Sequence, residues 1–247
     1  MMKIMRKLVK KLGLAEFFIR FFIKINDFSL MEINKLTIIE NDGIHPKHGI
    51  MKYHDFFINN VKRGSRVLDI GCGNGAVAFD VAKKANKIVA IDLDKKNLEI
   101  AERKYRAKNI DYVCADATEY DFKENFDYII LSNVLEHIEK RIEFLKKIKK
   151  LAPVILIRVP MINRDWVPLY KKKLGMYYYS DKTHFIEYDT EVFKKEMKSA
   201  GLKIKNYSIQ FGEIWAVIDV IVAAIILTSI FKLKIGTESR KEFAVKE

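Results

Sequence analysis

A glycine-rich turn constrains the fold of this chain more than any other feature. Residues 67–75 have the sequence Val-Leu-Asp-Ile-Gly-Cys-Gly-Asn-Gly, in which an apolar strand leads into the turn, and a helical pattern starts at Ala76. Glycines at 71, 73 and 75 permit backbone angles that other residues avoid, and they let a ligand approach the backbone closely. The N-terminus of the next helix would offer N–H groups to an anionic group. The pattern predicts a strand–turn–helix unit that binds a partly anionic ligand.

The residues around this turn alternate between strand and helix patterns. Short apolar runs predict strands at 66–70, 87–92, 110–115, 126–132 and 154–159, and helical periodicity predicts helices at 76–84, 95–106, 139–150 and 190–200. Such alternation is typical of βαβ units in a parallel sheet. Two further strands, 202–211 and 213–218, are joined by a turn that is too short for a helical crossover, so they should pair antiparallel. The sequence predicts an α/β fold: a Rossmann-like seven-stranded, mostly parallel sheet with helices on both faces and an antiparallel last strand.

Composition and charge limit the classes of partner. The chain has 247 residues, two cysteines and a formal net charge of +13. Two cysteines exclude a disulfide scaffold and a zinc ribbon, and they favour a reducing, cytoplasmic location. The net charge suggests nucleic acid or an anionic membrane as a partner. However, basic residues are spread along the chain rather than gathered in one arm, so nucleic acid is disfavoured but not excluded.

Three regions are expected. Residues 1–60 form a basic amphipathic helix and a cap, 61–218 form the main domain with a substrate-side insertion at 161–189, and 219–247 form an apolar and then charged tail. Residues 1–25 are predicted to form one amphipathic helix with seven basic side chains against Glu16, which fits either a cap packed on the domain or a helix on an anionic membrane. The apolar stretch 214–231 contains Asp219, which favours a strand and an apolar or interfacial helix over a spanning helix. Peripheral membrane contact would therefore involve 1–25 and 219–235.

Three carboxylates stand at successive strand ends. Asp69 lies two residues before the first glycine, where it can accept hydrogen bonds from an ammonium group. Asp92 ends the next strand and is placed to bind both hydroxyls of a ribose, and Asp116 follows the third strand, where it can bind an adenine amino group. A ligand with an amino-acid end, a ribose and an adenine matches all three. The glycines with Ala76 also fit a dinucleotide fingerprint, so a nicotinamide oxidoreductase stays as an alternative.

From Gly64 to Ile218 the chain resembles class I S-adenosylmethionine-dependent methyltransferases. The matching segments, in order, are 67–75, 90–92, 115–117, 126–130 and 133–138. The last of these, Asn-Val-Leu-Glu-His-Ile, resembles the subgroup that contains ubiquinone-biosynthesis O-methyltransferases and many small-molecule enzymes. The resemblance implies S-adenosylmethionine as cofactor and S-adenosylhomocysteine as product.

The resemblance also implies residue roles. The methionine portion of the cofactor would be held by Asp69, Gly71, Gly73 and Gly75, with Cys72 contributing as part of the loop and its thiol having no chemical role. Asp92 would bind the ribose, Leu93 would pack on the adenine, and Asp116, next to Ala117, would bind the adenine amino group. Ser132 and Asn133 would border the sulfonium and the methyl group.

His137 and His184 are the candidate acid–base residues. A neutral imidazole could take the proton of a hydroxyl acceptor while the methyl group transfers. The alternatives are a helix-start histidine bonded to backbone for His137 and a loop-ordering histidine for His184. His45, His48 and His54 are expected to belong to a helix that covers the cofactor, and no metal site is predicted.

The function implied is methyl transfer to an oxygen or nitrogen atom of a small or amphiphilic metabolite, including a lipid-linked one. The fourth strand is not followed by an Asn/Asp-Pro-Pro-aromatic motif, which argues against the amino-directed DNA and protein-glutamine enzymes of that type. An RNA or protein methyltransferase and a non-catalytic S-adenosylmethionine-binding protein remain as alternatives.

Overall fold

The structure, a computed structural model, describes residues 2–41 and 43–220, with the side chains of residues 2–5 left out. The chain divides into two compact units, Met1–Tyr53 and His54–Glu247. Residues 221–247 lie outside the described part, so the expected apolar helix and the membrane contact of the C-terminal tail lie outside it as well.

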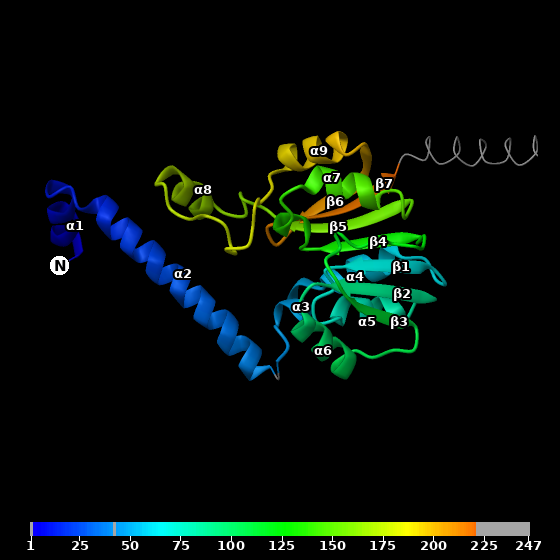
Figure 1. The fold of residues 1–247 in the computed structure, drawn as a ribbon. Helices are drawn as coiled ribbons and strands as arrows, with labels where there is room; N and C mark the ends of the chain where they lie inside the picture. Colours follow the sequence, from blue (N-terminus) through cyan, green and yellow to red (C-terminus); the bar gives the residue numbers. More distant parts are fainter. Residues whose placement is uncertain (1, 42, 221–247) are drawn as a thin grey trace, which may run out of the picture. The chain divides into compact units, whose positions relative to one another are not determined.

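The first unit is helical and is drawn in blue in Figure 1. It contains α1 (Met2–Lys11), α2 (Ala15–Glu40) and α3 (Lys47–Met51). The sequence predicted one helix from Met1 to Ile25, but the structure breaks it at Gly13, whose φ of +67° is a left-handed conformation that ends helices. The second helix then continues to Glu40, well beyond the predicted end. No residue of α2 is buried.

The second unit contains the predicted sheet. Its strands are β1 (Arg66–Ile70), β2 (Lys87–Asp92), β3 (Ile110–Cys114), β4 (Tyr128–Ser132), β5 (Val154–Pro160), β6 (Leu202–Gln210) and β7 (Glu213–Val220). They lie in the order β3-β2-β1-β4-β5-β7-β6. Neighbours from β3 to β5 pair parallel, whereas β7 pairs antiparallel with both β5 and β6. The predicted fold class is confirmed.

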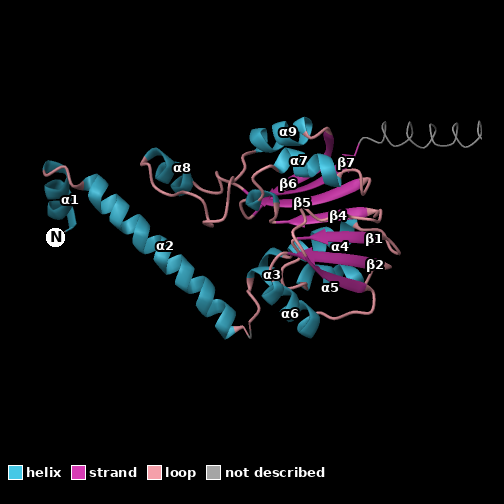
Figure 2. Ribbon diagram, viewed as in Figure 1, coloured by secondary structure: helices cyan, strands magenta, loops and turns pink. Residues whose placement is uncertain are grey.

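Helices flank this sheet on both faces (Figure 2). They are α4 (Tyr53–Asn60), α5 (Ala76–Ala82), α6 (Lys95–Lys104), α7 (Arg141–Ile148) and α9 (Thr190–Ser199), with a short 3-10 helix η1 (Leu135–His137) after β4. Helix α8 (Trp166–Lys173) follows β5 and lies apart from the sheet. Most lie within a few residues of the predicted bounds. Helix α8 was not predicted, because its Asp165 cap and apolar positions lie within a segment of aromatic and lysine residues that shows no clear helical period.

Burial on both faces explains why the central strands are continuous apolar runs. Leu68 and Ile70 of β1 belong to a core cluster with side chains of α7 and α9, while Val67, on the other face by alternation, is also fully buried. Ligands of open α/β sheets bind beyond the carboxyl ends of the parallel strands, at the point where the strand order reverses. Here this point lies between β1 and β4.

The start of the apolar stretch 214–231 is strand rather than helix. Strand β7 extends to Val220, and Asp219 pairs in register with Val154 of β5 and Lys203 of β6. Within the described residues, no helix combines the length and the apolar character needed to cross a membrane.

Candidate active site

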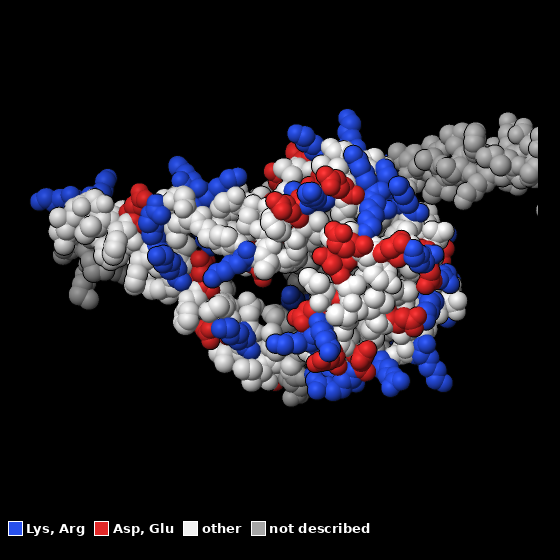
Figure 3. Space-filling model, viewed as in Figure 1, with Lys and Arg blue, Asp and Glu red and all other residues white. Residues whose placement is uncertain are grey.

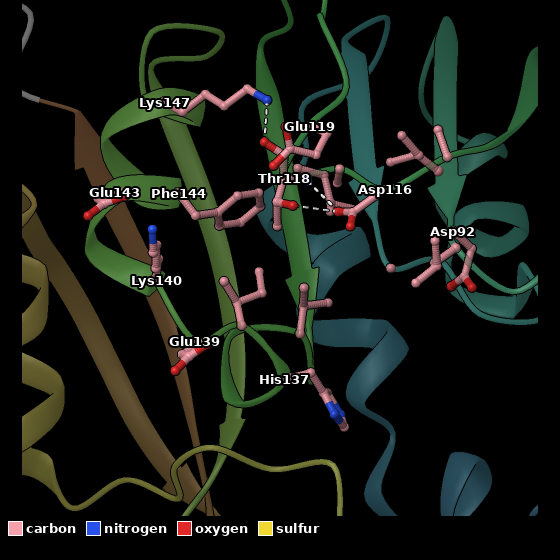
Figure 4. A pocket seen from close by; sticks show the side chains of 18 of the residues that line it. Asp92, Asp116, Thr118, Glu119, His137, Glu139, Lys140, Glu143, Phe144 and Lys147 are labelled. Carbon is pink, nitrogen blue, oxygen red and sulfur yellow. Dashed lines mark hydrogen bonds between the residues drawn. The ribbon is translucent and has the colours of Figure 1, made fainter.

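A cavity of about 790 Å³ opens at the carboxyl ends of β1 to β4 (Figure 4). This volume lies in the range of cofactor and ligand sites. The predicted site residues that line it are Gly71, Asp92, Leu93, Asp116, Ala117, Asn133 and His137. Those that are not among its lining residues are Asp69, Cys72, Gly73, Gly75, Ser132 and His184. The structure thus brings residues from the ends of β1, β2, β3 and β4 to one cavity. Apart from His184, the predicted residues that do not line it lie in the same strand ends and the loops that follow them.

The glycine turn needs glycine for conformation and for space. Gly71 and Gly75 have φ of +65° and +82°, in the left-handed region. A Cβ at Gly71 would lie 2.6 Å from a methyl group of Val134, and a Cβ at Gly75 would lie 2.6 Å from the hydroxyl of Tyr112. Burial raises the pKa of the Cys72 thiol, which keeps it protonated and agrees with its having no chemical role.

Asp92 links the end of β2 to the glycine turn. One carboxylate oxygen accepts a hydrogen bond from the backbone N–H of Gly73 at 2.7 Å, and the other accepts one from Asp94 N–H at 2.8 Å. Each oxygen of an ionised carboxylate can accept a second bond. Both oxygens are therefore fixed in position while retaining capacity for two ribose hydroxyls. The side chain of the next residue, Leu93, is 71% exposed and is available to cover a base.

Asp69 is almost completely buried at the end of β1. It is 1% exposed, and its Oδ2 has no hydrogen-bond partner. Burial, together with the nearby charge of Asp92, raises the pKa of this carboxyl to about 8. A buried polar atom without a partner costs free energy, which an ammonium group would recover. The amino-acid end of S-adenosylmethionine supplies such a group, so the residues present fit this cofactor.

Asp116 has a local structural role as well as its predicted ligand role. Its Oδ1 accepts hydrogen bonds from the backbone N–H of Thr118 at 2.8 Å and from the Thr118 hydroxyl at 2.7 Å, both drawn in Figure 4. The loop conformation thereby positions the carboxylate beside Ala117 at the cavity wall. Oδ2 remains for an amino group of the ligand.

Asn133 follows β4 and is held in place by Arg158 of β5. Its φ of +57° is unusual for a residue other than glycine. Its backbone N–H donates to the Arg158 carbonyl at 2.8 Å, and its side-chain oxygen accepts from Arg158 Nε at 2.8 Å. Arg158 is buried and also pairs with Glu213 at 3.2 Å, while Ser132 stands opposite it in the β4–β5 register. The sequence analysis missed Arg158, for which the signal was a single charge inside an apolar strand.

The two candidate acid–base histidines are in contact. Their ring centroids lie 4.7 Å apart at an interplanar angle of 75°. His137 lines the cavity and is partly exposed. Its partial burial, and to a lesser extent the neighbouring charge of His184, lowers the pKa of its imidazole. A lowered pKa favours the neutral form, which can accept a proton. His184 does not line the cavity, and its Nδ1 lies 3.2 Å from Glu187 Oε1.

Hydrogen bonds determine which nitrogen of His137 can act as a base. The Thr183 hydroxyl donates to Asp181 at 2.6 Å and lies 2.8 Å from His137 Nδ1. A hydroxyl has one proton to donate, so it must accept the bond from His137 Nδ1–H. This tautomer leaves the lone pair on Nε2. Asp181 and Thr183 were not predicted as site residues, although the sequence analysis placed His184 in the same segment.

Within the described part of the chain, one cluster could hold a metal ion. Glu136, His137 and His184 offer ligand atoms within 4.8 Å of one another. Glu136 is fully buried, neither of its carboxylate oxygens has a hydrogen-bond partner, and burial raises its pKa to about 8. A divalent cation would stabilise the ionised form of this carboxylate.

The three histidines near the N-terminus each contact a polar side chain. His45 lies 2.9 Å from the Asn34 side chain, His48 lies 2.7 Å from the Tyr53 hydroxyl, and His54 lies 2.7 Å from Asp80. The first two belong to the first unit and the third to the second.

The surface charge is mixed. On the face shown in Figure 3, Lys and Arg side chains alternate with Asp and Glu over the second unit rather than forming one continuous basic stripe. Nucleic-acid sites need such a basic surface. This face therefore adds no support for a nucleic-acid partner.

Comparisons with known proteins agree with this geometry. Residues 67–152 match the family model described as a methyltransferase domain. The chain is 33% identical over 110 residues to a ubiquinone biosynthesis O-methyltransferase of Bradyrhizobium diazoefficiens, covering 43% of this chain and 44% of the relative. It is 32% identical over 102 residues to the ribosomal protein L11 methyltransferase of Thermotoga maritima, covering 40% and 38%. The chain thus spans less than half the length of these relatives.

A solved structure supports the fold. The magnesium protoporphyrin IX methyltransferase ChlM of Synechocystis PCC 6803, with bound SAH, superposes with a TM-score of 0.55 at 16% identity, covering 69% of this chain and 83% of that one. The strand order, the glycine turn, the carboxylates at successive strand ends and the matched domain all point the same way. They identify residues 67–152 as a methyltransferase domain on a fold of the class I S-adenosylmethionine-dependent type, with S-adenosylmethionine as the cofactor of this domain.

Proposed function

We propose that this chain methylates an oxygen or nitrogen atom of a small or amphiphilic metabolite, with a hydroxyl oxygen as the preferred acceptor. The observation that carries this proposal is the placement of His137. It lines the predicted cofactor cavity, its pKa is lowered, and Thr183 holds it in the tautomer that exposes a basic Nε2.

The chemistry is an in-line displacement. When bound, S-adenosylmethionine supplies a methyl carbon that is already electrophilic because it is attached to a sulfonium. The hydroxyl oxygen forms the new bond to this carbon, and the electron pair of the carbon–sulfur bond goes to sulfur. His137 Nε2 takes the hydroxyl proton, and Asp181 stabilises the resulting imidazolium through Thr183. Asn133, fixed by Arg158, borders the reacting atoms and contributes positioning.

The substrate-side insertion supports an amphiphilic acceptor. Four of its large apolar side chains are exposed, namely Trp166, Leu169, Tyr177 and Phe185. The same segment contributes Thr183 and His184, which both contact His137. An acceptor with a hydroxyl head and an apolar body would bury part of this surface as its hydroxyl reached His137. A metabolite of this kind includes lipid-linked compounds, and the name of the Bradyrhizobium relative is consistent with the class.

A titration and a transfer assay test the cofactor and the reaction. Isothermal titration of the full chain is expected to show binding of S-adenosylmethionine and S-adenosylhomocysteine and no binding of NADH. With methyl-tritiated S-adenosylmethionine and a cell extract, label is expected to enter the lipid or polar small-molecule fraction. Label in RNA or protein instead would favour the macromolecular alternatives. Cofactor binding with no transfer to any fraction would indicate a non-catalytic binding protein.

Substitution of the histidine tests the base. His137→Gln is expected to lower the transfer rate to a hydroxyl acceptor about 100- to 1,000-fold, because a positioned general base contributes about that factor. Thr183→Val should retain part of the rate, since the imidazole stays but its orientation is less restricted. Binding of S-adenosylhomocysteine should change little in either variant. His45→Gln, which alters a histidine of the other unit, is the matched control.

A second mechanism is favoured by the buried Glu136. With His137 and His184 it would bind a divalent cation, which would lower the pKa of an acceptor hydroxyl. Treatment with EDTA separates the two mechanisms. If His137 acts as a base alone, the rate is unchanged by EDTA and falls as the pH drops through the pKa of His137. If a cation is required, EDTA abolishes transfer, added Mg²⁺, Mn²⁺ or Zn²⁺ restores it, and Glu136→Gln prevents the recovery.

A further inference from the structure

Helices α1 and α2 have apolar faces that nothing in their own unit buries. Along the first half of α2, large side chains recur at helical spacing, and Phe17, Phe21, Phe22, Ile25 and Phe28 are all exposed, Phe17 to 62% and Phe28 to 60%. On the same half, Glu16, Arg20, Lys24 and Asp27 form a polar stripe along one edge of this apolar side. In α1, Leu8 is exposed as well. Contiguous exposed apolar surface of this kind marks an interaction site.

Charge indicates what this surface binds. In the described part of α1, Arg6 and Lys10 lie on the side opposite Leu8 and Lys7 and Lys11 lie on one flank, and the sequence of the helix contains no acidic residue. Long cationic side chains next to an apolar face extend toward anionic head groups while their stems stay in apolar surroundings. The ion pair between Arg20 and Glu16, at 2.7 Å, lies on the polar side of α2 and leaves the aromatic side open.

We propose that α1 and the first half of α2 bind the surface of an anionic membrane, lying in the plane of the interface with Leu8 and the aromatic side inserted. The side chains favour a lipid surface over a protein groove because both helices, on either side of Gly13, expose apolar side chains next to basic ones, Leu8 beside Lys7 and Lys11 and Phe17 beside Arg20 and Lys24. The inference does not depend on the identity of the methyl acceptor, although an amphiphilic acceptor would be met at the same surface.

The test is flotation of the full chain with lipid vesicles. Vesicles of phosphatidylcholine with about one third phosphatidylserine should carry the protein to the top of the gradient, and vesicles of phosphatidylcholine alone should carry much less. Raising the salt concentration to about 0.5 M should weaken the binding, because screening shortens the range of the attraction to the anionic head groups.

Two sets of variants separate the apolar and the charged contributions. Phe17→Ser with Phe21→Ser and Phe28→Ser should abolish flotation on both kinds of vesicle. Arg6→Gln with Lys7→Gln and Lys10→Gln should weaken binding to the anionic vesicles about 100-fold, since each charge near the surface contributes about fivefold. The matched controls are Ile209→Ser, an exposed apolar residue of β6, and Lys194→Gln with Lys195→Gln and Lys198→Gln on α9.

Several outcomes would overturn the proposal. Wild-type protein that stays at the bottom of the gradient with anionic vesicles would do so, as would equal loss of flotation in the α9 control. A monomer–dimer equilibrium that the phenylalanine variants abolish, without any flotation, would assign the face to a second copy of the chain. Titration with S-adenosylhomocysteine in each variant keeps this result separate from the enzyme proposal, because the cofactor residues belong to the other unit.

Discussion

The Asp92→Ala variant is expected to bind S-adenosylhomocysteine at least about 100-fold more weakly than the wild-type chain. The substitution would remove two charge-assisted hydrogen bonds between the Asp92 carboxylate and the ribose, each of which contributes about 1.5–3 kcal/mol. The glycine turn would also lose its restraint, because Gly73 N–H would no longer have the carboxylate as its acceptor. Isothermal titration measures the dissociation constant directly.

Two further variants separate ligand contact from support of the turn. Asp92→Asn keeps one oxygen acceptor and removes the charge, so its affinity for S-adenosylhomocysteine should lie between those of the wild-type chain and Asp92→Ala. Asp111→Ala makes the same chemical change at a carboxylate of β3 that pairs with Lys87 and does not line the cavity. It should bind like the wild-type chain. A loss in Asp111→Ala equal to that in Asp92→Ala would show that the effect reflects general destabilisation and not the ribose contact.

The sheet could be predicted because its elements are determined locally. The parallel strands inside the sheet, β1, β2, β4 and β5, are buried on both faces, so each appears in the sequence as a mainly apolar run that ends at a turn or a polar residue. The carboxylates could be placed for the same reason. Asp69 is the penultimate residue of β1 and Asp92 is the last residue of β2. These strands pair directly in parallel, so their carboxyl ends lie at the same edge of the sheet.

The rest of the site depends on contacts that are distant in the sequence. Thr183 contacts His137 across 46 positions, and Arg158 fixes Asn133 across 25. Neither contact has a periodic signal, because Thr183 lies in an irregular loop after α8 and Arg158 differs from its neighbours only by its charge. The single helix predicted for residues 1–25 was wrong because of a local feature, the backbone conformation at Gly13. An apolar period that continues across a single glycine suggested one helix, whereas the left-handed backbone there separates two.

Binding of S-adenosylhomocysteine is expected to tighten as the pH rises from about 5.5 to 7.5. Burial and the charge of Asp92 raise the pKa of Asp69 to about 8, so in this range the unliganded carboxyl is mostly protonated. The ammonium of the ligand stabilises the ionised form and lowers this pKa in the complex. Binding below pH 8 therefore releases a proton, and by linkage the affinity should increase up to about tenfold per pH unit, levelling off near pH 8. Titrations in buffers with different heats of ionisation measure the proton released.

The matched ligand is 5′-methylthioadenosine, which keeps the adenine and the ribose but has no amino-acid end. Its affinity should not follow the titration of Asp69, because it brings no ammonium to the buried carboxyl. Asp69→Asn should make the affinity for S-adenosylhomocysteine equally insensitive to pH in this range. In Asp92→Asn, the loss of the neighbouring negative charge should move the levelling-off point to lower pH, since that charge contributes to the raised pKa. A pH slope that persists in Asp69→Asn would assign the proton to another group and remove Asp69 from the ammonium site.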